Sequence, residues 1–430
     1  MQTIVIAGGG AGGLELATRL GDSLGKAGQA RIVLVDRWPS HFWKPLLHTV
    51  ASGKRAAQAT SVDYAAQAEG HCFTFQRGDM TGIDRAARTI TLAALTGDDG
   101  TEIMPQRALA YDKLVLALGS VTNFYAVPGA AEHVFTLDDV PQAQAFHQRF
   151  LDGCMRASAR HAAGGGDEGL DIVIVGGGAT GVELAAELSH SARMLARYKV
   201  HALDPVRHVR IRILERGSFL LPHLHPRLSR RAARHLRSLG IKVCTDTAVA
   251  RVEDGVVIDT EGRAYLSTMT LWAAGVEAPA LCRTLDLTVN RLGQVSVGPT
   301  LQTVDDPAIY ALGDCASLVN PVGGAIAPRA QAAHQQALYL AETLGRPGSP
   351  AAFAYRDYGS LVSLGPLAAV GVLSGTVGKR KLQVGGFVAR WLYALMYRKH
   401  LMALHGFARM AARTAADWIS DRISPPVKLH

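Results

Sequence analysis

The chain has 430 residues, 48% of them hydrophobic and 19% charged, with a mean hydropathy of +0.11, which excludes a disordered chain and favours two or three folded domains. The formal charge is +9, and the segment from Lys379 to His430 carries +8 of it. A nearly neutral body with a basic end excludes a nucleic-acid-binding surface spread over the molecule and favours a local anionic partner.

The cysteine pattern favours a reducing compartment and no metal site. The five cysteines are scattered and form no CxxC pair, which argues against a disulfide framework or a zinc site: Cys72, Cys154, Cys244, Cys282 and Cys315. Met1 runs directly into the first predicted strand and leaves no room for a cleaved leader, so we expect folding in the cytosol.

The first 36 residues predict a strand, a glycine-rich turn, a helix and a second strand. An apolar run at 3–7 precedes Gly8-Gly9-Gly10-Ala11-Gly12-Gly13, and a helix is expected over about 11–25. In this pattern a pyrophosphate rests on the helix N-terminus, so Gly8, Gly10 and Gly13 are candidates for holding it. Asp36 ends the second strand, at 31–36, and is placed to bind the ribose of an adenosine, although an isolated acid there would more often be a solvated strand end.

A second fingerprint repeats this pattern after short strands over 70–118 and a flexible joint at Gly164–Asp167. The apolar run 172–175 precedes Gly176-Gly177-Gly178-Ala179-Thr180-Gly181, and Gly176, Gly178 and Gly181 are the matching candidates. Glu215 ends the next strand, 34 residues after Gly181, and an insertion at 191–207 explains the long spacing. A carboxylate there repels the extra phosphate of NADPH and favours NADH. Two dinucleotides in one chain suggest electron transfer between them.

Polar residues after the fingerprints supply the catalytic candidates. Glu183 and Glu187 are four residues apart on the predicted helix, and Glu183 lies where a nicotinamide would rest, able to orient the cofactor or relay a proton. Asp314 follows an apolar strand and would face a phosphate or the ribitol of the first cofactor, unless it caps a helix. On the late helix, expected over 330–344, Gln331 and Gln335 share a face that can hold carbonyl oxygens of a flavin or quinone, whereas His334 is expected to be structural or exposed.

The basic tail contains an amphipathic stretch over 387–405. Apolar residues recur there at helical spacing beside Arg390, Arg398 and Lys399, which suits the surface of an anionic bilayer. A core helix or a dimer contact is the alternative. No run of 18 apolar residues is present, so no transmembrane helix is expected.

Taken together, these motifs resemble the type II NADH:quinone oxidoreductases, the NADH dehydrogenases that do not pump protons. The motifs are the two fingerprints, strand ends at Gly119 and Gly275, Gly313-Asp314, and the run Ala330–Gln335. The resemblance covers essentially the whole chain. His41–His48, Tyr355–Ser363 and the Lys428–His430 end are similar to the proteobacterial branch.

This resemblance implies FAD in the first site, NADH in the second and a membrane quinone, ubiquinone or menaquinone, as acceptor. It implies a peripheral homodimer on the cytoplasmic face of the bacterial inner membrane, with no nucleic acid as partner. It places Gln331 and Gln335 at the quinone and flavin end, Glu183 near the nicotinamide, and Lys44 and Pro45 by the flavin. The remaining candidates for cofactor contact are Ala117, Gly119, Gly275 and Ala330. Lys379 resembles a lysine near the quinone.

The implied fold is α/β, with two Rossmann-like domains as in glutathione reductase and the second inserted into the first. An FAD-binding domain is expected at 1–130 and 290–345, an NADH-binding domain at 131–289, and a quinone and membrane region at 346–430. A sulfide:quinone oxidoreductase using Cys154 and Cys315, another two-dinucleotide FAD reductase, and a redox sensor with little turnover are the alternatives. A disulfide reductase would need a CxxxxC pair, and 38–55 contains no cysteine. DNA binding through the tail is a weaker alternative.

Overall fold

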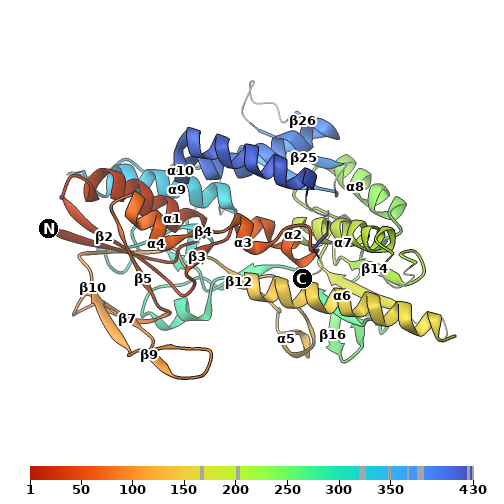
Figure 1. Cartoon of the computed structure of the whole chain (residues 1–430). Coiled ribbons are helices and arrows are strands. Elements are labelled where there is room, and N and C mark those ends of the chain that lie inside the picture. The colour runs from red at the N-terminus through yellow and green to blue at the C-terminus, as the bar shows by residue number, and fades with distance from the viewer. Residues whose placement is uncertain are drawn as a thin grey trace. The chain divides into compact units, whose positions relative to one another are not determined.

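The computed structural model describes residues 1–164, 169–199, 204–318, 326–346, 348, 350–365, 368–374, 382–423 and 427–428. The chain forms two compact units (Figure 1), which we describe separately. Unit 1 comprises Met1–Lys44, Ser61–Val121 and Val276–Arg356. Unit 2 comprises Pro45–Thr60, Thr122–Gly275 and Asp357–His430. Of the predicted features, Gly165–Asp167 of the joint, residues 200–203 of the insertion, Lys379 and the final Leu429-His430 lie outside the described residues.

Unit 1 is built on a parallel sheet of five strands in the order β22-β11-β1-β2-β5. The strands are β1 (Gln2–Ala7), β2 (Ala30–Asp36), β5 (Thr74–Arg77), β11 (Lys113–Leu116) and β22 (Ile309–Ala311). Residues Ile4 to Ala7 of β1 are buried, as expected for a strand covered on both faces. Helix α1 (Ala11–Leu20) continues into a π-helical turn at Gly21–Gly25, which together span the predicted helix, and α9 (Ala330–Thr343) packs against α1.

Smaller elements complete unit 1. A three-stranded antiparallel sheet holds β6 (Met80–Asp84), β7 (Thr89–Leu92) and β10 (Arg107–Ala110). The others are β3 (Ser40–His41), β4 (Val62–Asp63), α4 (Tyr64–Gly70), β8 (Leu95–Thr96), β9 (Glu102–Met104), β20 (Val276–Glu277), β21 (Val295–Ser296), β23 (Ala316–Ser317), and 3-10 turns at Ala280–Thr284 and Gly313–Cys315.

Unit 2 repeats the same plan with a parallel sheet in the order β15-β14-β13-β19. Its strands are β13 (Leu170–Val175), β14 (Val209–Leu214), β15 (Lys242–Cys244) and β19 (Met269–Trp272), and α7 (Ala179–Arg197) follows β13. The insertion predicted at 191–207 therefore begins as the last two turns of α7. The other elements of this part are α2 (Leu47–Ala51), α3 (Ala57–Thr60), α5 (Ala130–His133), α6 (Val140–Ala162), α8 (Pro226–Ser238), β16 (Val249–Glu253), β17 (Val256–Asp259) and β18 (Ala264–Leu266). A 3-10 turn at Lys44–Leu46 and the short strand β12 (Val121–Thr122) lie where the chain passes between the units.

The C-terminal part of unit 2 is an antiparallel sheet, β24 (Gly359–Ser363), β25 (Ala369–Leu373) and β26 (Leu382–Gly385), followed by α10 (Phe387–Ile423). Leu361, Ala369 and Ala389 form a buried cluster that joins the sheet to α10. The helix predicted over 387–405 is confirmed and extends further, with a break at Gly406, where φ is 73°. Within the described part of the chain, no helix is long and apolar enough to cross a membrane.

Candidate functional site

The first fingerprint forms an open cradle at the N-terminus of α1. Gly8 has a φ of 108°, and a Cβ there would collide with the Ala117 carbonyl, while a Cβ at Gly13 would collide with the carbonyl of Gly8. At Gly10 a Cβ would meet no atom within 4 Å, and no side chain caps α1. Close packing behind the loop and open space in front of uncapped N–H groups are what a pyrophosphate requires.

Asp36 lies beside this loop, as the sequence predicts. Its carboxylate accepts hydrogen bonds from the Gly9 N–H at 2.6 Å and the Trp38 N–H at 2.8 Å. Burial raises the pKa of Asp36, and these two bonds oppose that rise.

The second fingerprint repeats this geometry in unit 2. Gly176 has a φ of 110° and packs against the Ala273 carbonyl, Gly181 packs against the Gly176 carbonyl, and Gly178 faces open space. Glu215 accepts from the Gly177 N–H at 2.7 Å and from the Gly217 N–H at 2.6 Å. The long spacing therefore still brings Glu215 to the position that Asp36 holds in unit 1, because the extra residues precede β14.

Gly275 follows β19 at the same edge of the unit 2 sheet. Its carbonyl accepts from the Asn123 N–H at 3.0 Å, and a Cβ there would collide with the Tyr125 hydroxyl. Tyr125 is 51% exposed, so its side chain could move to make room for a Cβ at this position.

A polar chain lies at the carboxyl ends of β11 and β22 in unit 1. The Lys44 ammonium donates to the Ser120 carbonyl at 2.7 Å, and the Ser120 hydroxyl donates to Asp314 at 2.8 Å. Burial raises the pKa of Asp314, with Ser120 and Lys44 opposing the rise. Ala117 and Gly119, whose φ is 71°, lie at the same end of β11. The sheet thus brings together Lys44, Asp314, Ala117 and Gly119, and it adds Ser120, which the sequence gave no reason to choose.

Helix α9 begins at Ala330 and carries Gln331 and Gln335 one turn apart. The side-chain amide of Gln335 donates to the Arg356 carbonyl at 2.8 Å and accepts from the Arg356 N–H at 3.0 Å. Gln331 is half-buried, and the adjacent Gln336 is buried and accepts from the Gly313 N–H at 2.7 Å. Gln336 therefore joins α9 to the turn that carries Asp314, a link that the periodicity of the helix did not single out.

His334 has the structural role expected of it. Its Nδ1 lies 2.6 Å from the carboxylate of Glu15, a side chain of α1 that is 1% exposed, and Arg19 donates to the same carboxylate at 3.0 Å. The contact between His334 and Glu15 joins α9 to α1, whereas the Arg19 bond lies within α1.

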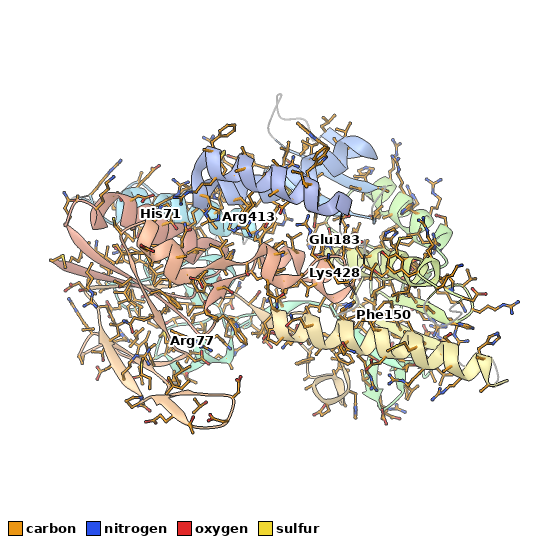
Figure 2. All side chains as sticks on the ribbon, viewed as in Figure 1. His71, Arg77, Phe150, Glu183, Arg413 and Lys428 are labelled. Atoms are coloured by element: carbon orange, nitrogen blue, oxygen red, sulfur yellow. The ribbon has the colours of Figure 1, made fainter. Side chains whose placement is uncertain are left out.

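Glu183, which Figure 2 labels, is the centre of a buried polar cluster in unit 2. It accepts from the Ser363 N–H at 2.8 Å, bonds to Tyr393, and lies 3.5 Å from Nδ1 of His48. Burial raises the pKa of Glu183 to about 8 and lowers that of His48 to about 4. Near neutral pH the Glu183 carboxyl is therefore protonated and His48 is uncharged. Glu187, one turn further along α7, is paired instead with Lys54 at 2.6 Å.

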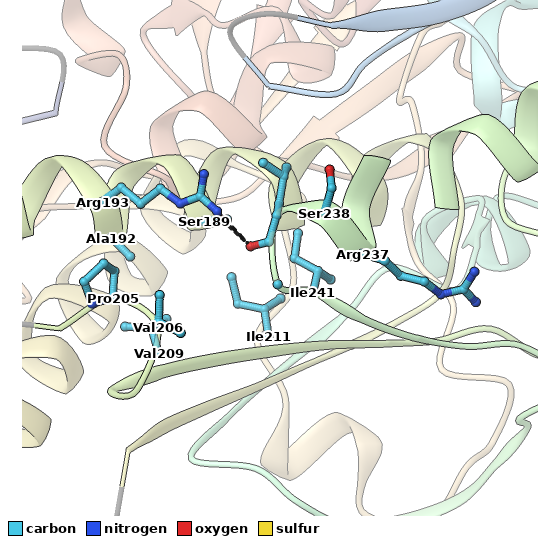
Figure 3. A pocket seen from close by; sticks show the side chains of 12 residues that line it. Ser189, Ala192, Arg193, Pro205, Val206, Val209, Ile211, Arg237, Ser238 and Ile241 are labelled. Carbon is cyan, nitrogen blue, oxygen red and sulfur yellow. Dashed lines mark hydrogen bonds between the residues drawn. The ribbon is translucent and has the colours of Figure 1, made fainter. Parts of the chain in front are cut away.

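A cavity of about 320 Å³ lies elsewhere in unit 2 (Figure 3). It is lined by the second half of α7, the end of α8 and the start of β14, including Ala192, Arg193, Val209 and Ile211. Arg193 donates to the Leu239 carbonyl at its wall, at 3.1 Å. Because it lies at the amino end of β14, it is distinct from the fingerprint and Glu215 at the carboxyl end.

Three of the five cysteines, Cys154, Cys282 and Cys315, are buried, which disfavours their thiolates. Burial raises the pKa of Cys154 to about 12 and that of Cys282 to about 11, and it raises the pKa of Cys315 still further. A thiol attacks sulfur as its thiolate, so these burial effects disfavour the sulfide-oxidising alternative. Among the described residues, no group of three or more His, Cys, Asp or Glu side chains could hold a metal ion.

Comparison with known proteins identifies the family. The family described as pyridine nucleotide-disulphide oxidoreductase matches residues 2–337. A type II NADH:quinone oxidoreductase of Haemophilus influenzae is 37% identical, and the match covers all of both chains. The chain belongs to the type II NADH:quinone oxidoreductases.

The chain is also similar to a second reductase, and its fold matches a solved structure. The demethylphylloquinone reductase of Synechocystis is 30% identical over 98% of each chain. The structure of NDH2 from Plasmodium falciparum in complex with NADH superposes with a TM-score of 0.82 at 18% identity, covering 99% of this chain and 100% of that one. The predicted α/β fold with two dinucleotide-binding halves is confirmed.

Proposed function

We propose that this protein is an NADH:quinone oxidoreductase that works on a membrane surface through bound FAD and does not pump protons. Its membership of the type II family, shown by the full-length match at 37% identity, is the observation that carries this conclusion. FAD and NADH are the cofactor and the substrate of that family, and two dinucleotide cradles in one chain suit the pair.

We assign FAD to the cradle of unit 1 and NADH to that of unit 2. The open space at Gly10 and at Gly178, each before an uncapped helix, fits one pyrophosphate in each unit. Bound flavin supplies the chemistry, since it accepts a hydride and returns two electrons. As domains we propose 1–130 with 290–345 for FAD, 131–289 for NADH, and 346–430 for the quinone and membrane region. The compact units have other bounds, since 45–60 and 122–130 belong to unit 2 and 276–289 belong to unit 1.

The residues of the chain position and protect the reactants in this proposal. Asp36 and Glu215 hold the two adenosine riboses, and the charge of Glu215 disfavours a 2′-phosphate. Lys44, Pro45 and Asp314 serve the flavin end of the first cradle, together with Ala117, Gly119 and Ala330, while Gly275 borders the second. Gln331 and Gln335 are the proposed quinone-side amides, and Gln335 would act while bonded to the backbone of Arg356.

Glu183 is the proposed proton-holding group. Its carboxyl is buried and keeps its proton near neutral pH because burial raises its pKa to about 8. Reduction of a quinone to a quinol consumes two protons, so a protonated acid on the NADH-binding unit suits the reaction.

We place the membrane-facing surface on the C-terminal part of unit 2. Along α10, the side chains of Val388, Trp391, Met402 and Phe407 are exposed although apolar. Helix α8 contacts β25 of the same part and exposes an arginine face, which consists of Arg227, Arg230, Arg231, Arg234 and Arg237. Exposed apolar groups and a row of exposed arginines are both features that suit an anionic bilayer. We expect a homodimer at the cytoplasmic face of the inner membrane.

The deciding experiment is anaerobic. The flavin-loaded protein is mixed with NADH while flavin absorbance is followed, and a short-chain quinone is then added. Rapid bleaching and rapid return of colour establish NADH:quinone turnover. Bleaching without recovery would reject the quinone as acceptor, and bleaching by sulfide but not by NADH would move the protein to the sulfide-oxidising class.

A further inference from the structure

Both polar groups of the Gly9 backbone are held by side chains of unit 1. Its carbonyl accepts a hydrogen bond from the Tyr64 hydroxyl at 2.7 Å and lies 2.9 Å from Nδ1 of His41. Its N–H donates to Asp36 at 2.6 Å. Tyr64 is 2% exposed and His41 is 3% exposed, so bulk water does not compete for either hydrogen bond.

Fixing the Gly9 carbonyl also fixes the next N–H. The described peptide bonds include no cis bond, and in a trans peptide the carbonyl and the following N–H point in opposite directions. With its carbonyl held by Tyr64 and His41, the Gly9–Gly10 peptide therefore directs the Gly10 N–H away from them. Gly10 is the position at which a Cβ would meet only open space.

The second fingerprint restrains the corresponding carbonyl by an unrelated means. The Gly177 carbonyl accepts from the backbone N–H of Leu221 at 2.8 Å, and the Gly177 N–H donates to Glu215 at 2.7 Å. One loop thus uses two side chains and the other a backbone N–H, yet each fixes the same peptide. The same peptide is therefore held in both candidate pyrophosphate loops, although the partners differ.

We propose that Tyr64 and His41 are positioning residues for the pyrophosphate of FAD, because they hold the Gly9–Gly10 peptide so that the Gly10 N–H faces the phosphates. This inference rests on the assignment of FAD to unit 1. The Gly9 carbonyl only accepts, so Nδ1 of His41 carries the proton in this contact. Burial lowers the pKa of His41 to about 4, which agrees with a neutral donor.

The test compares two tyrosines of unit 1. Tyr64→Phe removes the hydroxyl and keeps the ring, which packs against Phe75 at a centroid distance of 5.0 Å. Tyr111→Phe is the matched control, since Tyr111 is 3% exposed and its hydroxyl has no hydrogen-bond partner among the described residues. FAD release from the diluted holoenzyme is followed by the rise in flavin fluorescence. We expect release about fivefold faster for Tyr64→Phe and unchanged for Tyr111→Phe.

His41 is tested by a rescue pair. His41→Asn keeps a side-chain N–H near the position of Nδ1, and His41→Leu removes it. We expect fast FAD release only for His41→Leu. The ³¹P NMR signals of bound FAD should shift in Tyr64→Phe and His41→Leu, while the KM of Tyr64→Phe for NADH stays at the value of the Tyr111→Phe control.

Two results would overturn the inference. If Tyr64→Phe released FAD at the rate of the Tyr111→Phe control and its phosphorus signals did not shift, the Gly9 contacts would not serve the phosphates. A parallel loss of Tm, FAD binding and NADH binding would make them general packing contacts. If instead Tyr64→Phe raised the KM for NADH and spared FAD, the assignment of the two dinucleotides to the two units would be the part that failed.

Discussion

At the residue scale, each of the two glycine-rich fingerprints has an acidic residue at the same place beside it. Asp36 and Glu215 each end a strand and each accept the N–H of the second glycine in the adjoining fingerprint. Their identities and their distances from the fingerprints were visible in the sequence. The sequence did not show that the Tyr64 hydroxyl bonds to Gly9, nor that Ser120 lies between Lys44 and Asp314. Each of these contacts joins residues more than 50 positions apart.

Replacing Glu215 tests nucleotide choice. Glu215→Arg removes the charge that repels a 2′-phosphate and adds one that attracts it, so the preference for NADH over NADPH should fall by about tenfold or more. The ratio of the two kcat/KM values measures it. Glu261→Arg, an exposed substitution in the same unit, is the control. An unchanged ratio would remove Glu215 from the ribose site.

The raised pKa of Glu183 has a consequence for stability. In the unfolded chain this carboxyl loses its proton near pH 4.5, but in the folded protein it does so near pH 8. The folded state therefore binds more protons within that window, and its stability falls as pH rises through it. The titratable neighbours of Glu183 are His48, Glu187, Lys54 and Tyr393. A variant that changes only Glu183 keeps all four, so their effect on the pH dependence of stability is present in both variant and wild type.

Glu183→Gln tests this sign. The amide keeps an acceptor for the Ser363 N–H but cannot ionise, so the Tm of the variant should fall less between pH 6 and pH 9 than that of the wild type, by roughly 2–4 °C. Differential scanning calorimetry at several pH values measures it, with the exposed Glu253→Gln as control. Parallel curves for wild type and variant would contradict the buried, protonated state.

At the element scale, the long helices are joined by few but specific polar contacts. Glu15 on α1 and His334 on α9 form one such joint, and Gln336 ties α9 to the turn after β22. Helical periodicity predicted where α1 and α9 begin. It did not predict that Glu15, in the middle of an apolar face, has its partner on a helix more than 300 residues away.

His334→Leu should loosen α9. It removes a hydrogen bond to a buried carboxylate, and we expect the free energy of unfolding to fall by about 2 kcal/mol. Urea unfolding measures the loss, and the exposed His223→Leu should cost almost nothing. A variant as stable as the wild type would show that this hydrogen bond contributes no net stability.

The arginine face of α8 should bind anionic lipid. Changing Arg227, Arg230 and Arg234 to Gln should weaken sedimentation with vesicles that contain phosphatidylglycerol by about tenfold or more, and added salt should shrink the difference. Arg149, Arg156 and Arg160 provide a matched triple substitution on α6, which runs along the opposite side of unit 2 (Figure 1).

Point substitutions suit this question better than truncation. Ala389 is buried against β24 and β25, and Arg413 donates to the Ala59 carbonyl at 3.0 Å, so deleting Lys379–His430 would damage unit 2 itself. Equal vesicle binding by the two triple variants would place the membrane contact elsewhere.

At the scale of the whole molecule, each compact unit is organised around one dinucleotide cradle. A ligand that binds only the folded state adds stability, by about 2.7 kcal/mol when its concentration is 100 times Kd. Removing FAD should therefore lower the Tm by several degrees, and added FAD should restore it. FMN, which lacks the pyrophosphate and adenosine, should restore much less. Equal rescue by FMN would locate most of the binding energy at the flavin ring instead of the cradle.

The sequence by itself determined the two βαβ units, their fingerprints, the acids at the strand ends and the basic amphipathic tail, because each depends on residues close together in the chain. Only the tertiary structure decided which groups lie within hydrogen-bonding distance of Gly9, that Glu183 lies buried among His48, Tyr393 and Ser363, and that the arginines of α8 adjoin the C-terminal sheet. Burial and long-range contact fix those properties, and neither is encoded in local spacing.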